Sequence, residues 1–498
     1  MAASISRSFI KAFKDTQVTD QDEFWAPNHF QSLPDDILLL IFHYLDIQTL
    51  CIAAQVSLHW RCIAYDNSLW KSINFNQLYD LSVYDNPEQF SLLADTRFYN
   101  TEKLHLGHLK ITDGNLNSIT DRCQNLKTLV FGRQEVNDVV GTLARHPRFV
   151  TNLKTLDIRM VMSTCEHFDS PDLKLGNLVN LGIGPCKFTP GSYSRLFTSL
   201  SALRVLDTTN CYEITDADVE SIGYACKNLE SVNFNNCRGI VGKSLESLLK
   251  NCPSIKTLLL RYLKIEDDIL MKDFWADTIL DELDLSACPN LTWQGLWRFL
   301  PMLRCIRYLN LSYCGMGHAV SDEVLTKFRN EGNLTKLEMM DIRWAFFISP
   351  LALLQFLEKC PSLQYLGVYQ SLRITTNVIC EATPHLKSLR MLEFGCVVPE
   401  DFASSQILCN IQEHCKNLEV VSLINFDTTN IDADYLRIQE FMAKMEHLVR
   451  MNFCDCNGYL AEAARTGKTD PNISITEIWE CCLPAPSRTL DNMIGKMF

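Results

Sequence analysis

The sequence lacks the features of membrane proteins and of proteins that coat nucleic acids. No stretch approaches the roughly 20 unbroken apolar residues of a membrane span, and the longest apolar run is Ile37–Phe42. Basic charge is also scarce, since 46 Lys and Arg stand against 59 Asp and Glu, for a net charge of −13. We therefore expect no membrane partner and no nucleic-acid partner.

The first residues lack the parts of a secretory signal. Met1–Lys14 holds Arg7, Lys11 and Lys14 and no acidic residue, but it has no apolar core and no small-residue cleavage site. We expect no secretory signal, while a weak targeting segment stays open. The expected localisation is cytoplasmic, nuclear or both.

Signatures of catalysis and of metal binding are missing as well. The sequence has no H-E-x-x-H, G-x-S-x-G or Walker pattern, and Gly182–Pro185 lacks the third glycine of a dinucleotide loop. It has no C-x-x-C, and the closest clusters, Cys454 with Cys456 and Cys481 with Cys482, fall short of a structural zinc site. We predict no metal, no cofactor and no catalytic activity in this chain.

An internal repeat is the dominant feature that the sequence does have. The pattern apolar-x-x-apolar-x-apolar recurs about every 25 to 30 residues, which is typical of a stacked repeat architecture. Its first positions are Thr101, Leu126, Leu153, Leu178, Leu203, Leu229, Ile255, Leu280, Ile306, Leu334, Leu363, Leu389, Leu418 and Leu448.

Eleven of the 21 cysteines keep one of two phases of this repeat. Eight residues after the first position lie Cys186, Cys211, Cys237, Cys288, Cys314 and Cys456. Three residues before it lie Cys123, Cys226, Cys252, Cys360 and Cys415. Without a secretory signal a disulfide framework is not expected. A small, readily buried thiol suits a tight interior turn in each repeat, so we predict a packing role.

Each repeat reads as a short strand followed by a helix. In Leu203–Leu229 the strand leads to a turn where Thr215 or Asp216 is a natural N-cap, and Val219 and Ile222 face inward from the helix. Over residues 101–456 the pattern resembles the cysteine-containing class of leucine-rich repeats. The resemblance implies an α/β solenoid, a curved parallel sheet with outer helices.

Side chains alternate along a strand, so the residues two, four and six places after the first position of each repeat should face the concave side. Stacked strands would give an inner edge of about 60 Å, a surface suited to a macromolecule. We predict a substrate-binding set of tyrosine anchors and steering carboxylates. That set is Tyr308, Tyr365, Tyr369, Asp157, Asp207, Glu282 and Asp284. Other expected face positions are Arg159, Arg261, Lys336, Glu338, Met340 and Met391. Alternatively, the polar residues are only solvated and the tyrosines form a cross-strand ladder.

A segment that does not follow the repeat pattern, Phe30 to Phe75, precedes the repeats. Pro34 suits the first position of a helix, and Asp35 and Asp36 suit its dipole. Ile37–Phe42 is apolar around the whole helix, so we expect burial on every side. A segment of about 45 residues cannot cover it alone. A partner protein or the repeats must do so.

The same segment resembles an F-box. The match is Leu33-Pro34-x-x-Ile37-Leu38-x-x-Ile41-Phe42-x-x-Leu45, followed by Leu50, Val56, Trp60 and Leu69-Trp70. Ser57 and His59 depart from the Cys and the basic residue that the family often has. The resemblance implies binding to a Skp-family adaptor and, through it, to a cullin–RING scaffold. It places the adaptor contacts at Leu33, Pro34, Ile37, Leu38, Ile41, Leu50, Val56 and Trp60. Alternatively, Val56 and Trp60 hold the three helices together.

These observations predict five segments: a flexible 1–29, an F-box at 30–75, a linker or first irregular repeat at 76–100, leucine-rich repeats at 101–456 and a cap or tail at 457–498. The last segment is too apolar for a solvated end, so it either caps the sheet edge or folds back along the concave face. Its apolar residues are Ile473, Ile475, Ile478, Trp479 and Leu483.

The resemblance implies the substrate-recognition subunit of an SCF (Skp–cullin–F-box) ubiquitin ligase. Such a subunit brings a protein substrate to the ligase for ubiquitination and proteasomal degradation. The alternative is a non-catalytic scaffold whose F-box binds an adaptor without a cullin. The sequence does not identify the substrate.

Overall fold

The fold is that of a computed structural model. It describes residues 33–75, 97–107, 109, 111–132, 136, 139–161, 173–185, 192–401, 406–427, 431–454, 456, 460–461, 464–465 and 473–478. The chain divides into two compact units. Unit 1 covers the described residues up to Glu213 together with Ser221–Leu229, and unit 2 covers Ile214–Glu220 and the described residues from Glu230 onward.

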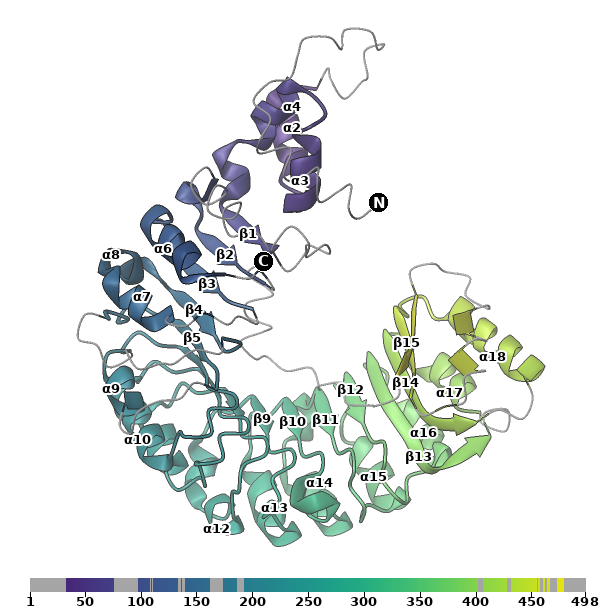
Figure 1. The fold of residues 1–498 in the computed structure, drawn as a ribbon. Helices are drawn as coiled ribbons and strands as arrows, with labels where there is room; N and C mark the ends of the chain where they lie inside the picture. The colour runs from purple at the N-terminus through teal and green to yellow at the C-terminus, as the bar shows by residue number, and fades with distance from the viewer. Residues whose placement is uncertain are drawn as a thin grey trace, which may run out of the picture. The chain divides into compact units, whose positions relative to one another are not determined.

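Unit 1 begins with three short helices and a 3₁₀ turn (Figure 1): α2 (Asp35–Phe42), α3 (Ile47–Ala53), α4 (Leu58–Ala64) and η1 (Asn67–Trp70). The carboxylate of Asp46 caps α3 by accepting from Thr49 N at 2.7 Å, and Ser57 Oγ caps α4 by accepting from Trp60 N at 3.1 Å. Helix α2 starts at Asp35, so Pro34 takes the cap position rather than the first helical position that the sequence predicted. The three helices pack over a small common core.

The repeats of unit 1 follow directly. Strand β1 (Ser72–Asn74) pairs in parallel with β2 (Lys103–His105), which joins the F-box segment to the first repeat. The remaining elements of unit 1 are η4 (Phe98–Asn100), α6 (Asp113–Arg122), β3 (Thr128–Val130), α7 (Val139–Arg145), α8 (Pro147–Asn152), β4 (Thr155–Ile158), β5 (Asn180–Ile183), α9 (Ser192–Thr198) and β6 (Val205–Asp207). Each strand from β1 to β6 pairs in parallel with the next in the chain.

Unit 2 continues the same alternation. Its strands are β7 (Ser231–Asn233), β8 (Thr257–Leu259), β9 (Glu282–Asp284), β10 (Tyr308–Asn310), β11 (Met339–Asp341), β12 (Tyr365–Gly367), β13 (Met391–Asp401), β14 (Val420–Asp427), β15 (Arg450–Cys454) and β16 (Ser474–Ile478). They pair in parallel and in chain order. In Figure 1, helices α13 to α15 lie on one face of β9–β12 and leave the other, concave face without helices.

The α-helices of the repeats are short, between four and fourteen residues long. Helix α10 (Asp216–Ala225) runs across the division between the units. The helices of unit 2 are α11 (Leu245–Asn251), α12 (Asp267–Leu270), η5 (Asp273–Asp277), α13 (Trp293–Phe299), η6 (Leu300–Met302), η7 (Cys314–Gly317), α14 (Asp322–Glu331), η8 (Leu334–Lys336), α15 (Pro350–Leu357), α16 (Thr376–Ala382), η9 (Thr383–His385), α17 (Ile407–His414) and α18 (Ile431–Lys444). The fold class is therefore the α/β one predicted, an N-terminal set of F-box helices followed by a repeat solenoid.

The repeat cysteines are packed inside, as their phase suggests. Ten of the eleven lie in the described residues and all ten are buried and free, while Cys186 lies outside them. Two of those after the strands donate to carbonyls of the preceding repeat. Cys211 Sγ lies 2.9 Å from Gly184 O, and Cys314 Sγ lies 2.9 Å from Leu285 O. Burial raises the pKa of Cys288 to about 12, which keeps this thiol protonated.

An aspartate at the start of several helices links one repeat to the next. Asp216 accepts from Val241 N at 2.9 Å and from Ser244 N at 3.0 Å. Asp322 likewise accepts from Ser349 N at 2.6 Å. Helix α10 begins at Asp216, which leaves Thr215 at the predicted N-cap position, and Asp218 accepts from Thr215 N at 3.0 Å. These carboxylates satisfy backbone N–H groups that a helix start leaves without partners.

A further strand, β16, follows the residues predicted to form the repeats. Strand β16 pairs in parallel with β15 over five residues and buries Ile473 just before it. For Ser474–Ile478 this agrees with the capping alternative, because a further strand covers the edge of β15. Trp479 and Leu483 lie outside the described residues.

Candidate protein-interaction surfaces

The first surface is an apolar face of the F-box helices. Helix α2 buries Leu38 and Phe42 against its neighbours but leaves Ile37 43% and Ile41 37% exposed. Further exposed apolar side chains on these helices and the turns between them are Leu40, Tyr44, Ile52, Val56 and Leu58. The chain alone therefore does not bury α2 on every side, so the remaining cover expected for this helix would have to come from a partner protein. Contiguous exposed apolar patches on a folded chain mark interaction sites.

The predicted adaptor contacts separate into two groups. Pro34, Ile37, Ile41 and Val56 are exposed and Leu33 and Trp60 are half-buried, whereas Leu38 is 1% and Leu50 3% exposed. Leu38 and Leu50 are thus core residues of the three helices, because they face the interior of the segment.

The alternative role suggested for Val56 and Trp60 holds for only one of them. Val56 is 60% exposed and does not hold the helices together. Trp60 does, since its ring packs edge-on against Phe42 with a centroid separation of 5.3 Å. His59, one of the departures from the F-box pattern, links α4 to the start of α2 through a 2.7 Å contact between Nε2 and Asp35 Oδ1.

Six of the predicted substrate-binding residues lie on strands and Tyr369 lies two residues beyond β12, but most of them are covered. Asp157, Asp207, Glu282, Tyr365 and Tyr369 are buried, and only Tyr308 and Asp284 are half-exposed. Even Tyr308 has a partner, because its hydroxyl donates to Glu338 Oε2 at 2.8 Å. Side chains that already hydrogen-bond one another are positioned as a network rather than as separate anchors.

In unit 1 the network is built around Arg159. Its guanidinium donates to both oxygens of Asp157, at 3.0 and 2.8 Å, and reaches Asp207 Oδ2 at 3.0 Å. Asp207 Oδ1 accepts from the backbone and the hydroxyl of Thr209, at 3.0 and 2.7 Å. Both oxygens of Asp207 therefore have partners. Burial nevertheless raises the pKa of Asp207, against the opposing effect of Arg159.

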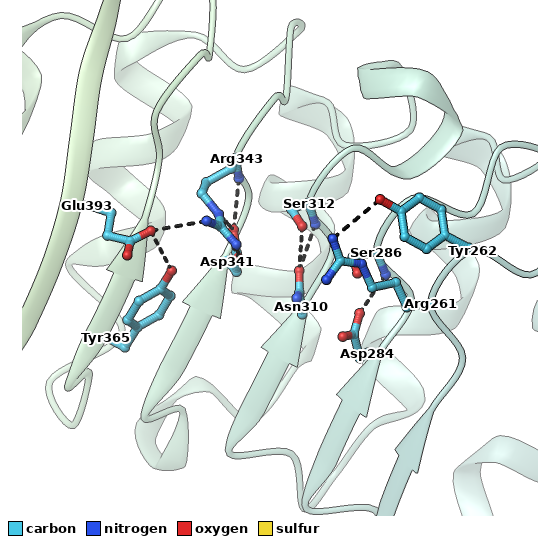
Figure 2. A network of polar contacts seen from close by, with 10 residues as sticks. All are labelled: Arg261, Tyr262, Asp284, Ser286, Asn310, Ser312, Asp341, Arg343, Tyr365 and Glu393. Carbon is cyan, nitrogen blue, oxygen red and sulfur yellow. Dashed lines mark hydrogen bonds and ion pairs between the residues drawn. The ribbon is translucent and has the colours of Figure 1, made fainter. Parts of the chain in front are cut away.

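Unit 2 contains a second bridge of the same design (Figure 2). Arg343 donates to Asp341 at 2.6 Å through Nη2 and at 2.9 Å through Nε, and its Nη1 reaches Glu393 Oε2 at 3.1 Å. The hydroxyl of Tyr365 donates to the same Oε2 at 3.1 Å. Glu393 Oε1 is buried and has no hydrogen-bond partner. Burial raises the pKa of Glu393 to about 7, although Arg343 opposes the shift.

A glycine on the intervening strand lets each arginine cross. Gly182 pairs with both Asp157 and Asp207, and Gly367 pairs with both Asp341 and Glu393. A side chain at Gly367 would obstruct the bridge, because a Cβ there would lie 2.8 Å from Tyr365 Oη and 3.1 Å from Asp341 Oδ1.

Polar side chains just beyond the strands extend the network (Figure 2). Asp284 Oδ1 accepts from Ser286 N at 2.8 Å, and Asn310 Oδ1 accepts from Ser312 N at 3.0 Å and from its hydroxyl at 2.8 Å. These short loops hold the acceptors in place at the ends of β9 and β10. Burial raises the pKa of Asp284, and the serine hydrogen bonds oppose the shift.

Three members of this network were not found from the sequence. Asp341 and Arg343 were missed because the repeat was placed at Leu334, whereas the structure has its first position at Leu337 and puts Leu334 in η8. The same error put Met340 on the concave face, although it is fully buried. Glu393 follows the last face position considered. The repeated tripeptide Asp-Ile-Arg at 157–159 and 341–343 is the signal that could have revealed the bridges.

The described residues form neither a membrane-spanning helix nor a metal-binding cluster. Among them, no helix combines the length and apolar character needed to cross a membrane. In the same part of the chain, no group of three or more His, Cys, Asp or Glu side chains has a metal-binding arrangement.

Comparison with known proteins supports the reading of the N-terminal helices. An F-box-like family model matches residues 30–76. A chain of the yeast Rad7–Elc1 complex is similar at 13% identity and a TM-score of 0.48, over 91% of this chain and 94% of that one. A chain of the TLR13–ssRNA13 complex is similar at 14% identity and a TM-score of 0.39, over 74% of this chain and 57% of that one. The chain thus combines an F-box-like segment at residues 30–76 with a solenoid of strand–helix repeats.

Proposed function

We propose that the protein is the substrate-recognition subunit of an SCF-type ubiquitin ligase. Its F-box would bind a Skp-family adaptor, and its repeats would bind the protein that is to be ubiquitinated and degraded. The chain would add no catalytic group. It would raise the rate by holding the substrate close to the enzyme that the cullin–RING scaffold recruits.

The observation that carries this proposal is the exposed apolar face of α2. Ile37 and Ile41 lie one helical turn apart and are exposed together with Leu40 and Tyr44. Leaving such a patch in water is unfavourable by about 25 cal/mol for each Å² of apolar surface, which a bound partner would recover. The F-box-like match at residues 30–76 covers this helix and supports a Skp-family adaptor as that partner.

Binding of purified adaptor tests the proposal. Ile37→Glu with Ile41→Glu should abolish binding in a pull-down, because two charges would then be buried against the adaptor. Leu33→Ala with Pro34→Ala should weaken it at the edge of the same face. The matched control is Leu351→Glu, which places a charge at a 63% exposed leucine of α15 and should bind as wild type. Full adaptor binding by the double glutamate variant would contradict the proposal.

Co-purification of a cullin distinguishes a ligase subunit from the alternative, a scaffold that binds an adaptor without a cullin. We expect the full chain to co-purify with adaptor and cullin in similar amounts, and the double glutamate variant to lose both. Adaptor without cullin would instead support a non-catalytic scaffold.

A further inference from the structure

One residue in most repeats of unit 2 has a left-handed backbone conformation. It lies three residues after the short strand ends, where the chain turns away from the sheet. The described residues at this position are Asn236, Tyr262, Ala287, Tyr313, Trp344 and Gln370, with φ between 54° and 64°. Asn210 occupies the equivalent position in unit 1, with φ 67°.

Three of these positions carry aromatic side chains, which is unfavourable for stability. A left-handed conformation suits Gly or Asn and is an outlier for a bulky residue. Burial does not compensate, since Tyr262 is 50%, Tyr313 40% and Trp344 37% exposed. Backbone strain that stability does not explain points to function. We call these three residues the aromatic edge.

Two residues of the aromatic edge, Tyr313 and Trp344, are joined through ring contacts to the second arginine bridge. The rings of Tyr313 and Trp344 meet edge-on with centroids 5.9 Å apart, and Trp344 meets Tyr369 at 6.1 Å. Arg343 lies over the ring of Tyr369 at 5.7 Å. A chain of direct contacts thus runs from the exposed rings to the guanidinium that binds Glu393.

The charges around Arg343 are not balanced, because two carboxylates lie beside one cation. A single guanidinium, that of Arg343, serves both Asp341 and Glu393. On its other side Glu393 pairs with Ser422 of β14, which carries no charge. Glu393 is 0% exposed, and its Oε1 is a buried acceptor without a donor. In unit 1 the corresponding oxygens of Asp207 are both occupied. A purely structural bridge does not need the extra acceptor.

We propose that the aromatic edge and Glu393 together bind an apolar segment of the substrate that carries a Lys or Arg. The tyrosine and tryptophan faces would attract the cation and pack against the apolar residues beside it. An N–H of the cationic group would donate to Glu393 Oε1 in a charge-assisted hydrogen bond. Because Oε1 is covered in this structure, binding would have to be coupled to a side-chain movement. This inference rests on the proposed function, in which the repeats bind the substrate.

A random twelve-residue peptide library displayed on phage, panned against the full chain in complex with adaptor, tests this site. We expect selected peptides to be enriched in Lys or Arg next to apolar residues. Their affinities, measured by fluorescence polarisation, should fall at least tenfold for Tyr313→Asn with Trp344→Asn and for Glu393→Gln. The aromatic variant should melt at the same temperature as wild type or higher, because Asn tolerates the left-handed conformation.

Two matched controls accompany these variants. Ala287→Asn introduces the same residue at the same repeat position without removing a ring. Glu419→Gln neutralises a carboxylate of unit 2 that is ion-paired with Arg390. Both should bind the selected peptides within threefold of wild type.

Two outcomes would overturn the inference: a library without enrichment of Lys or Arg, and selected peptides that bind the test variants as tightly as the controls. Adaptor binding is read separately through the F-box variants. Failure of the peptide experiment with intact adaptor binding would therefore reject this site while leaving the F-box assignment in place.

Discussion

The two units contain the same arginine bridge with different acceptors at its far end. In unit 1 Arg159 joins Asp157 to Asp207, and in unit 2 Arg343 joins Asp341 to Glu393, each across a glycine of the strand between. Thr209 completes the hydrogen bonds of Asp207. Glu393 keeps one oxygen without a donor. Stability requires the arginine and its two carboxylates, which both bridges have. It does not require the acceptor oxygen without a donor, which the bridge in unit 2 has in addition.

Removal of the arginines should have the largest effect and tests whether both bridges are structural. Arg343→Met leaves two buried carboxylates without their cation and should destabilise β11–β13 by about 3–5 kcal/mol. Arg159→Met should cost less, roughly 2–3 kcal/mol by the same reasoning, because Thr209 still donates to Asp207. Hydrogen exchange of the strand amides in each unit is the measurement. Losses below 1 kcal/mol in both units would show that the bridges are incidental.

The second largest effect should be on the pH dependence of stability, to which Glu393 contributes. Burial raises its pKa from an ordinary 4.5 to about 7 in the folded chain. The folded state therefore holds a proton that the unfolded state releases near pH 4.5, and the contribution of Glu393 to stability is lost as pH rises from about 5 to 7. Glu393→Gln has no proton to release, so it lacks this contribution. Its stability should therefore fall less than that of wild type between about pH 5 and 7, and the two losses should differ by at most about 3 kcal/mol.

Urea unfolding of wild type and Glu393→Gln at pH 5, 6, 7 and 8 measures this difference. Curves of stability against pH that run parallel for the two proteins would contradict it. Asp341, Arg343 and Tyr365 surround Glu393 and are common to both proteins, so the difference isolates one carboxyl group.

The glycine under the second bridge should have the smallest effect. Gly367→Ala would bring a Cβ within 2.8 Å of Tyr365 Oη and should cost about 1–2 kcal/mol by displacing that ring from Glu393. Gly114→Ala is the control, because its Cβ would meet only Thr112 Oγ1 at 3.7 Å and Ala favours the helix. Thermal melting of both variants measures the difference. Equal stability of Gly367→Ala and wild type would mean that the bridge adjusts without strain.

The regular parts of the fold were predictable because they repeat. An apolar period and a cysteine at a fixed phase each express one packing requirement many times, so single irregular repeats did not hide it. The same method failed where the spacing changed. The repeat at Leu337 follows an additional 3₁₀ turn at Leu334–Lys336, so the predicted register was three residues too early. This error assigned Met340 to the surface, although the structure has it in the core.

The F-box helices show a second limit. The run from Ile37 to Phe42 correctly indicated that α2 has no polar side, but periodicity could not say which side the chain itself covers. Packing against α3 and α4 decided that Leu38 and Leu50 are core and that Ile37, Ile41 and Val56 remain exposed.

The sequence by itself determined the order of elements, the α/β repeat class and the burial of the repeat cysteines, since these follow from local periodicity. Only the tertiary structure decided which polar side chains are partners. Arg343 meets Glu393 fifty residues away along the chain, because parallel strands bring equal positions of separate repeats into register and a glycine opens the path between them. No local sequence pattern encodes the pairing of Arg343 with Glu393, because it depends on which side chains the two following repeats carry at the equivalent strand positions.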